Sequence, residues 1–255
     1  MSPFTAEIIG TGILILLGNG VVANVVLNKT KGHQGGWIVI TWGWAMGVFA
    51  GVFTVAQFSG AHINPAVTVG LAVAGLFDWG LVIPYIVAQI IGAALGSLLV
   101  WLAYKDHFAA TDNKDLVLAC HCTAPNIRNF PSNVVTEVIG TFLLVFGVLY
   151  LVSPGFVTVE GEMLEAIIID GQHVGFGLGA LAALPVALLV LGLGLSLGGP
   201  TGYAINPARD LGPRIMHALL PIPTKGGSDW GYSWVPVLAP LIGAALAAGV
   251  YVMLS

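Results

Sequence analysis

The sequence predicts an all-α membrane protein with six transmembrane helices and two re-entrant half-helices, arranged as an inverted repeat. Its 255 residues are 57% hydrophobic and only 8% charged, whereas soluble domains carry about a quarter charged residues. Six apolar segments are long enough to cross a bilayer, which takes about 20 residues. Short motifs of the first half also recur, in the same order, in the second half.

The six apolar segments are predicted as membrane-spanning helices. They cover residues 4–27, 37–58, 81–104, 134–152, 175–197 and 235–254. Residues 1–5 carry no basic side chain, so the first segment is expected to be a permanent helix and not a cleaved signal peptide. Two shorter apolar stretches follow Asn64 and Asn206. They are too short to cross and are predicted to enter the membrane and turn back.

The internal repeat predicts the topology. Residues 7–11 are echoed by 137–141, 60–66 by 202–208, and 91–95 by 242–246. We therefore divide the chain into a first repeat, 1–125, with its half-helix after Asn64, and a second, 126–255, with its half-helix after Asn206. Each repeat crosses the membrane three times, so the second starts on the opposite side and is inverted. The half-helices then meet near the midplane, where such folds place their functional sites.

The paired Asn-Pro-Ala motifs predict a water-lined constriction. They are Asn64-Pro65-Ala66 and Asn206-Pro207-Ala208. Asn caps a helix and Pro suits its first turn, so two helix N-termini should face each other with partial positive charges. This field disfavours cations and hydronium. Irregular backbone at membrane depth lines a cavity, so a ladder of acceptor carbonyls is expected from the residues before each motif: Gly60, Ala61, His62, Thr201, Gly202 and Tyr203.

At this point the whole chain resembles the aquaporin superfamily, and within it the glycerol facilitators. The second motif continues into Arg209 and Asp210, with Arg214 four residues further on, and the last helix contains Pro240-Leu241; all match that branch. Residues 198–203 and 217–221 also look like lactobacillar facilitator paralogues, some of which pass undissociated lactic acid.

The resemblance implies a narrow selectivity filter made of Arg209, Trp44 and Tyr203. Gly194 stands where water-selective members carry a His, which implies a wider filter. Tyr203 departs from the usual Phe, and its hydroxyl would narrow the filter or add a polar contact. Arg209 would bind hydroxyls with its fork of donors and repel cations, while the aromatic rings face the carbon side of a polyol. Trp42 is expected to point away, toward the membrane border.

Two acidic residues lie inside apolar helices. Glu7 and Glu137 are functional candidates by default, because an intramembrane carboxylate is costly. One alternative is a proton relay. The resemblance, with their symmetric places in the repeat, implies instead that each supports a re-entrant loop by accepting backbone hydrogen bonds.

The function expected from these observations is a passive channel for glycerol and other small uncharged solutes, with water, that excludes ions and protons. The alternatives are a facilitator mainly for water, hydrogen peroxide or undissociated lactic acid, or a coupled secondary transporter. No enzyme motif and no cofactor are expected. Cys120-His121-Cys122 offers too few ligands for a closed zinc site, and a net charge of −4 without a basic patch argues against nucleic acid.

The resemblance also implies a homotetramer in the cell membrane, with both termini in the cytoplasm. The charges conflict with this orientation, because it leaves no Lys or Arg in the cytoplasmic loops, contrary to the positive-inside rule. The acidic connection over 153–173 is predicted as a solvated loop, with a short surface helix over 159–170 as the alternative.

Overall fold

The computed structural model describes residues 1–151, 155–158, 163–164, 166–175 and 177–255. Among these residues, six helices are long and apolar enough to cross a membrane. They are α1 (Pro3–Val26), α2 (Trp37–Ser59), α4 (Trp79–Ala109), α6 (Phe130–Leu149), the run Gly179–Leu197 formed by η1 (Gly179–Ala183) and α7 (Leu184–Leu197), and α9 (Trp234–Leu254). The other α-helices there are α3 (Pro65–Val73), α5 (Lys114–Ala119) and α8 (Pro207–Leu219).

The six predicted spans are confirmed, with ends that differ most in α4, in α6 and at the start of the fifth span; α6 begins four residues before the predicted 134 and ends three before the predicted 152. The helix α4 runs past the predicted end at Tyr104, through a kink where that residue has φ −112° and ψ 18°. The sequence placed the boundary there because polar residues follow. The short helix α5 was not predicted; Asn113 caps it by accepting from two backbone N–H groups.

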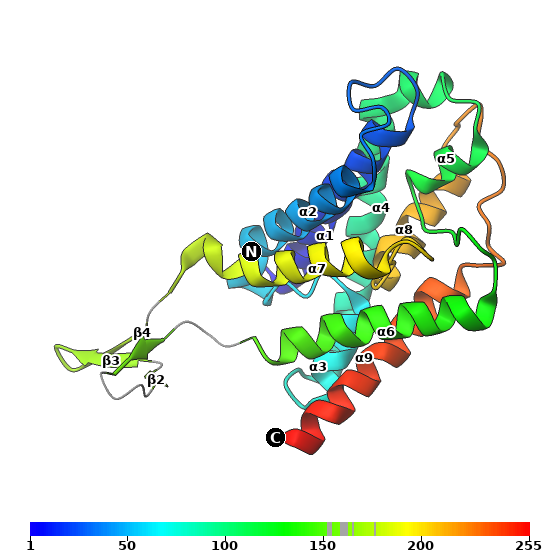
Figure 1. The fold of residues 1–255 in the computed structure, drawn as a ribbon. Coiled ribbons are helices and arrows are strands. Elements are labelled where there is room, and N and C mark those ends of the chain that lie inside the picture. Colours follow the sequence, from blue (N-terminus) through cyan, green and yellow to red (C-terminus); the bar gives the residue numbers. More distant parts are fainter. Residues whose placement is uncertain (152–154, 159–162, 165, 176) are drawn as a thin grey trace.

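The connection before α7 contains two β-hairpins. Strands β1 (Phe156–Val157) and β2 (Met163–Leu164) pair antiparallel, as do β3 (Ala166–Ile169) and β4 (Gln172–Gly175). The surface-helix alternative is therefore wrong for 163–164 and 166–169, since these residues form strands, and the loop predicted over 153–173 contains paired strands. Residues 153–154, 159–162 and 165 lie outside the described residues. The strand β4 also explains why the fifth span begins at Gly179 and not at 175. In Figure 1 the β3–β4 hairpin projects away from the helices.

The two halves of the chain have the same order of helices. In the first half α1 packs against α2 and α4, and in the second α6 packs against α7 and α9. A Cβ on Gly92 of α4 would overlap the Ile8 carbonyl of α1, and one on Gly243 of α9 would overlap the Val138 carbonyl of α6. These close approaches give a structural reason for the repeated Ile-Gly-Ala-Ala-Leu segments, because small residues let membrane helices touch.

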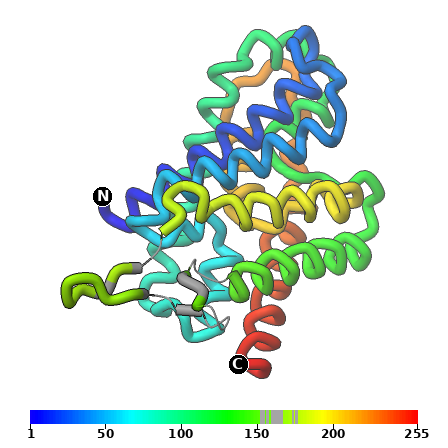
Figure 2. Tube along the Cα trace, turned by 60° about the vertical axis from the view of Figure 1, so that its left-hand side comes forward, coloured from blue at the N-terminus to red at the C-terminus, as the bar shows by residue number. Residues whose placement is uncertain are grey.

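The half-helices α3 and α8 lie inside the bundle, and each packs mainly against a long helix of the other half. Helix α3 packs mainly on α9 of the second half, and α8 packs mainly on α4 of the first. The two half-helices also contact each other. Helix α7 packs against both α2 and α6, as the yellow tube beside the blue and green ones shows in Figure 2. The two halves thus contact each other through both half-helices and through α2 and α7.

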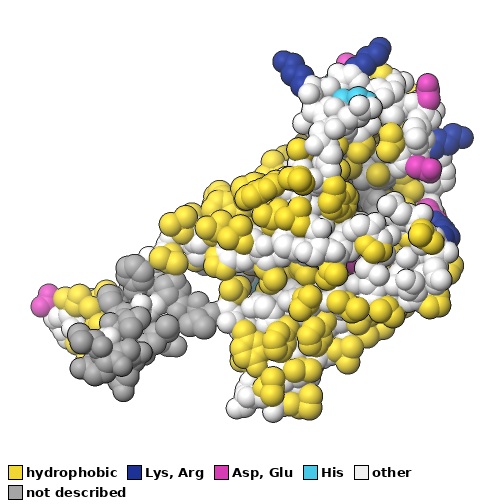
Figure 3. All heavy atoms as spheres, viewed as in Figure 1, with side chains coloured by type: hydrophobic (Ala, Val, Ile, Leu, Met, Phe, Trp, Pro, Cys, Tyr) yellow, Lys and Arg dark blue, Asp and Glu magenta, His cyan; other side chains and the backbone are white. Residues whose placement is uncertain are grey.

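The outer surface of the bundle is apolar. Large hydrophobic side chains such as Ile83 and Leu102 are more than half exposed along the long helices, and Figure 3 shows them spread over the helix faces. The Lys and Arg side chains visible there lie at the end away from the hairpins. Figures 1 and 2 place both termini at the hairpin end. The apolar faces suit lipid or a neighbouring subunit.

Candidate functional site

The two loops that lead into the half-helices adopt the same unusual backbone. In the first, Gly60, Ala61 and Ile63 have φ of 78°, 51° and 43°. At the equivalent places of the second loop, φ is 79°, 37° and 42° at residues 202, 203 and 205. Non-glycine residues rarely adopt positive φ, and such a backbone persists only where its surroundings fix it. Both loops must therefore be held by contacts from outside themselves.

Glu7 of α1 holds the first loop. Its Oε1 accepts from the Ser59 hydroxyl at 2.6 Å and the His62 N–H at 3.0 Å. Its Oε2 accepts from the Ile63 N–H at 2.7 Å and Gln89 Nε2 at 2.7 Å. The carboxylate is fully buried, so these four donors replace its lost hydration.

Glu137 of α6 holds the second loop in the same way. Its Oε1 accepts from the Thr201 hydroxyl at 2.6 Å and the Ala204 N–H at 2.9 Å, and its Oε2 accepts from the Ile205 N–H at 2.9 Å. Both carboxylates are thus fully engaged with donors of the chain. This arrangement suits support of the loops and leaves neither group placed as a proton carrier.

The two Asn residues are fixed by crossed hydrogen bonds. Each side-chain oxygen accepts from the backbone N–H two residues further on, at 2.8 Å for Asn64 and 3.0 Å for Asn206. Asn64 Nδ2 donates to the Ile205 carbonyl at 2.8 Å, and Asn206 Nδ2 donates to the Ile63 carbonyl at 2.9 Å. Each amide nitrogen keeps one more hydrogen to offer a solute. Sequence reasoning missed these crossed bonds, because spacing alone does not show which carbonyl faces which amide.

A cavity of about 220 Å³ runs between the two loops. Most of its wall is apolar, with Val48, Val67, Leu144 and Val190 among its residues. Eight of the predicted site residues line it: Trp44, Gly60, Ala61, His62, Asn64, Tyr203, Asn206 and Arg209. The other predicted pore residues are absent from its wall: Pro65, Ala66, Gly194, Thr201, Gly202, Pro207 and Ala208.

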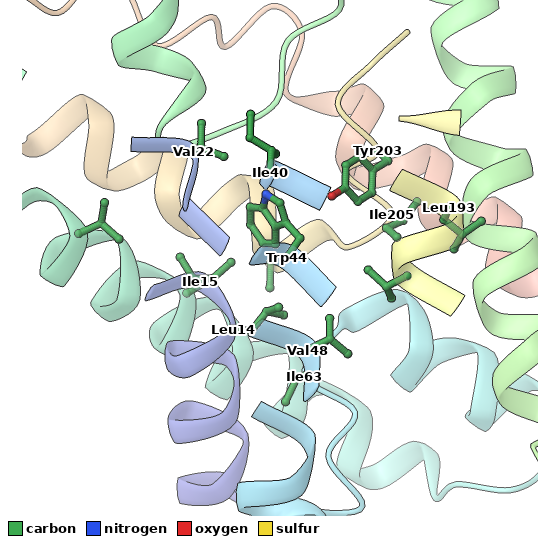
Figure 4. Packing of buried hydrophobic residues seen from close by; sticks show 14 of the residues in the cluster. Leu14, Ile15, Val22, Ile40, Trp44, Val48, Ile63, Leu193, Tyr203 and Ile205 are labelled. Atoms are coloured by element: carbon green, nitrogen blue, oxygen red, sulfur yellow. The ribbon is translucent and has the colours of Figure 1, made fainter. Parts of the chain in front are cut away.

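At one place on this wall Trp44, Tyr203 and Arg209 come together, and we call them the aromatic–arginine cluster. The Arg209 guanidinium lies over the Trp44 ring, 4.0 Å from its centre. Arg209 Nη1 also donates to the His121 carbonyl at 3.4 Å. Trp44 is 4% exposed and Trp42 is 47% exposed, so the second tryptophan points outward as expected. Figure 4 shows Trp44 of α2 and Tyr203 of the second loop side by side.

Gly194 lies directly against the tip of the Tyr203 side chain and leaves room for it. A Cβ on Gly194 would lie 2.8 Å from Cζ of Tyr203 and 2.9 Å from its hydroxyl. The room that this glycine leaves is therefore filled by the tip of the Tyr203 ring. Trp37 supports both residues: its Nε1 donates to the Gly194 carbonyl at 2.9 Å, and its ring meets Tyr203 edge to face at 5.8 Å. The Tyr203 hydroxyl itself is buried and has no hydrogen-bond partner among the described residues.

The Cys120-His121-Cys122 segment is buried against the bundle. Both cysteines are free thiols, and burial raises the pKa of each, which opposes the thiolate form that metals bind. Within the described part of the chain, no three His, Cys, Asp or Glu side chains gather in a way that could hold a metal ion. The segment's backbone, through the His121 carbonyl, is what reaches the cluster.

A buried ion pair fixes the half-helix that carries Arg209. Arg214 Nε donates to Asp210 Oδ1 at 2.7 Å, and both side chains are fully buried. Asp210 Oδ2 also accepts from the N–H and the hydroxyl of Thr123. The sequence offered these residues only as marks of a resemblance. Their spacing of four on a helix is the signal that indicates a mutual contact.

Comparison with known proteins places this architecture. The family model described as major intrinsic protein matches residues 1–251. This chain belongs to the major intrinsic protein family. Among its relatives, the probable glycerol uptake facilitator protein of Thermotoga maritima is 51% identical over 251 residues, covering 98% of each chain.

Two further matches agree with the family assignment. Glycerol uptake facilitator protein 3 of Lactiplantibacillus plantarum is 50% identical and covers 95% of this chain and 92% of its own. Among solved structures, the aquaglyceroporin from Plasmodium falciparum matches with a TM-score of 0.79 at 31% identity, covering 97% of this chain and 93% of that one. As a member of the major intrinsic protein family with six membrane-length helices, the chain is a multi-pass membrane protein.

Proposed function

We propose that this protein is a passive channel for glycerol and other small uncharged solutes, with water, in the cell membrane. The observation that carries this proposal is the aromatic–arginine cluster on a largely apolar cavity, with two pinned Asn amides further along the same wall. A polyol has a hydroxylated edge and a hydrocarbon edge. The cluster offers a fork of donors to the first and aromatic faces to the second.

Exclusion of ions follows from the charges along the path. Arg209 is a fixed cation that is 6% exposed, and both half-helices start at the Asn residues with their positive ends toward the cavity. A cation or hydronium would meet both fields without a carboxylate to bind it, because Glu7 and Glu137 lie outside the cavity wall and their oxygens are occupied by loop donors. The same occupancy disfavours a coupled secondary transporter, which needs an ionisable group that can exchange protons or ions. A channel makes and breaks no covalent bond, so we assign no catalytic residue and no cofactor.

Undissociated lactic acid, hydrogen peroxide and water are the alternative main solutes. The Tyr203 hydroxyl favours lactic acid. It has no hydrogen-bond partner among the described residues, and it adds a polar group next to the aromatic rings that would face the carbon atoms of a solute. A solute with polar groups on both edges would gain from it.

We further propose a homotetramer of inverted repeats, 1–125 and 126–255, with one pore per subunit and cytoplasmic termini, as in the family. This orientation puts the exposed basic side chains outside the cell, against the positive-inside rule. Labelling of single cysteines introduced at Lys31 and at Ser255 in intact cells tests it: only the cysteine at Lys31 should react with a membrane-impermeant reagent. The reverse pattern would invert the assignment.

Stopped-flow light scattering on proteoliposomes tests the channel proposal. Gradients of glycerol, urea, lactic acid and sorbitol are compared with protein-free vesicles. Rapid glycerol entry that neither saturates nor depends on a proton gradient supports a channel. Water flow without glycerol flow would contradict the glycerol preference, and no enhancement for any solute would contradict an open channel.

A further inference from the structure

Arg209 is connected to α1 through one backbone carbonyl. The His121 carbonyl oxygen accepts from Arg209 Nη1 at 3.4 Å and from Asn19 Nδ2 at 3.0 Å. Asn19 lies in the C-terminal half of α1 and is fully buried. The residue before it, Gly18, packs against the Trp44 ring, and that ring lies under the Arg209 guanidinium. Two adjacent residues of α1 therefore contact the surroundings of this pair: Gly18 packs against Trp44, and Asn19 binds the carbonyl that accepts from Arg209.

Asn19 is a costly residue in this position. The neighbouring buried residues of α1 include Leu14, Ile15 and Val22. The Asn19 Oδ1 atom is buried and finds no hydrogen-bond partner in the part of the chain that the structure describes, and such an unpaired acceptor destabilises a fold. A leucine of similar size would avoid this cost. The contribution that only the amide can make is its donor bond to the loop carbonyl.

The same loop residue is also held from the side of α4. The Ser97 hydroxyl and His121 Nδ1 are 2.8 Å apart. The imidazole is fully buried and packs edge to face on His217, with ring centres 5.3 Å apart. The side chain and the carbonyl of His121 are thus fixed separately, the first by α4 and the second by α1.

We propose that Asn19 is a positioning residue for Arg209. By holding the His121 carbonyl, it fixes the guanidinium over Trp44 and so sets how strongly the cluster discriminates among small neutral solutes. Asn19 is absent from the cavity wall, so it acts through the loop and not by touching solute. This inference rests on the proposed function, in which Arg209 selects the solute.

The test compares Asn19→Leu with Asn28→Leu. Asn28 is a matched control, because its Nδ2 makes the same kind of bond, to the Ala110 carbonyl at 3.0 Å, in a different loop. Two quantities are measured for the full-length protein: the glycerol-to-water permeability ratio in proteoliposomes, and amide hydrogen exchange of residues 119–124 in detergent. The loss of one buried hydrogen bond predicts about fivefold faster exchange in Asn19→Leu, and the permeability ratio should change at least threefold. Neither quantity should move in Asn28→Leu.

The outcomes separate this inference from the proposed function. Equal exchange and equal permeability ratios in the two variants would overturn the positioning role. If wild-type vesicles pass no glycerol, the proposed function fails, while the exchange comparison still decides whether Asn19 holds the loop. Should Asn19→Leu fail to fold, Ser97→Ala is the second variant. It removes the other anchor of His121 and should loosen the same residues, and unchanged exchange there would count against the proposal.

Discussion

Gly18→Ala should narrow the aromatic–arginine cluster by displacing Trp44, although no residue that lines the cavity is substituted. A Cβ on Gly18 would lie 2.6 Å from Cδ2 of Trp44 and closer still to Cε3 and Cζ3. Carbon atoms in ordinary contact are about 3.5–4.0 Å apart, so the ring must move by about 1 Å or more. Figure 4 shows α1 on the side of Trp44 away from Tyr203. The displacement is therefore directed toward Tyr203 and into the path of the solute.

The expected effect differs between glycerol and water. Overpacking a tight site costs about 1–3 kcal/mol, and glycerol must fit between the displaced Trp44 and Tyr203. A cost of about 1.4 kcal/mol is tenfold in a rate or binding constant, so glycerol permeability should fall about tenfold. Water is smaller and should slow by less than about threefold. Both are measured by stopped-flow light scattering on vesicles with matched amounts of protein.

Gly20→Ala is the matched control for this experiment. It lies two residues further along α1, and a Cβ there would meet no heavy atom of the described residues within 4 Å. The two variants change helix propensity equally, so any difference between them reports on Trp44. Equal glycerol-to-water ratios in Gly18→Ala, Gly20→Ala and wild type would refute the reasoning.

Three further predictions concern the charged and titratable groups. Glu137→Gln puts an amide NH₂ against a loop N–H, which leaves a buried donor unpaired and should lower the free energy of unfolding by about 2 kcal/mol; an unchanged melting temperature in detergent would contradict this. Arg209→Ala removes the fixed cation and should let protons leak, measured with a pH-sensitive dye inside vesicles; tight vesicles with normal glycerol flow would show that the half-helix fields suffice. Burial and the nearby His217 and Lys225 lower the pKa of His121 to about 3, whereas the imidazole of the unfolded chain takes up its proton near pH 6.5. The free energy by which His121 stabilises the folded loop is therefore fully present above pH 6.5 and decreases as the pH falls below that value. Hydrogen exchange of residues 119–124, corrected for intrinsic rates, should quicken about tenfold per pH unit from 6.5 to 4.5, and an equal trend in His121→Phe would assign it to another group.

The membrane architecture was accessible from the sequence because its signals are local. A run of apolar residues becomes a spanning helix wherever it occurs in lipid, since backbone polar groups must be satisfied within the segment. The caps of α3 and α8 are equally local, because Asn64 and Asn206 bond to the next turn of their own chain. The hairpin β3–β4 was harder to predict from the sequence. Its turn is short, with φ of 49° at Asp170 and 76° at Gly171, and its strands project from the bundle, so no buried face imposes an alternating hydrophobic pattern on them.

The sequence alone determined the spans, the half-helices and the residue types at the constriction, because each depends on neighbours along the chain. Only the tertiary structure decided which groups contact each other across the constriction. The bond from Asn64 to the Ile205 carbonyl joins the two repeats, and the His121 carbonyl joins Asn19 to Arg209. Likewise, the space beside Gly194 is filled by Tyr203. Such contacts depend on helix packing at ångström precision, and no local pattern of residues encodes them.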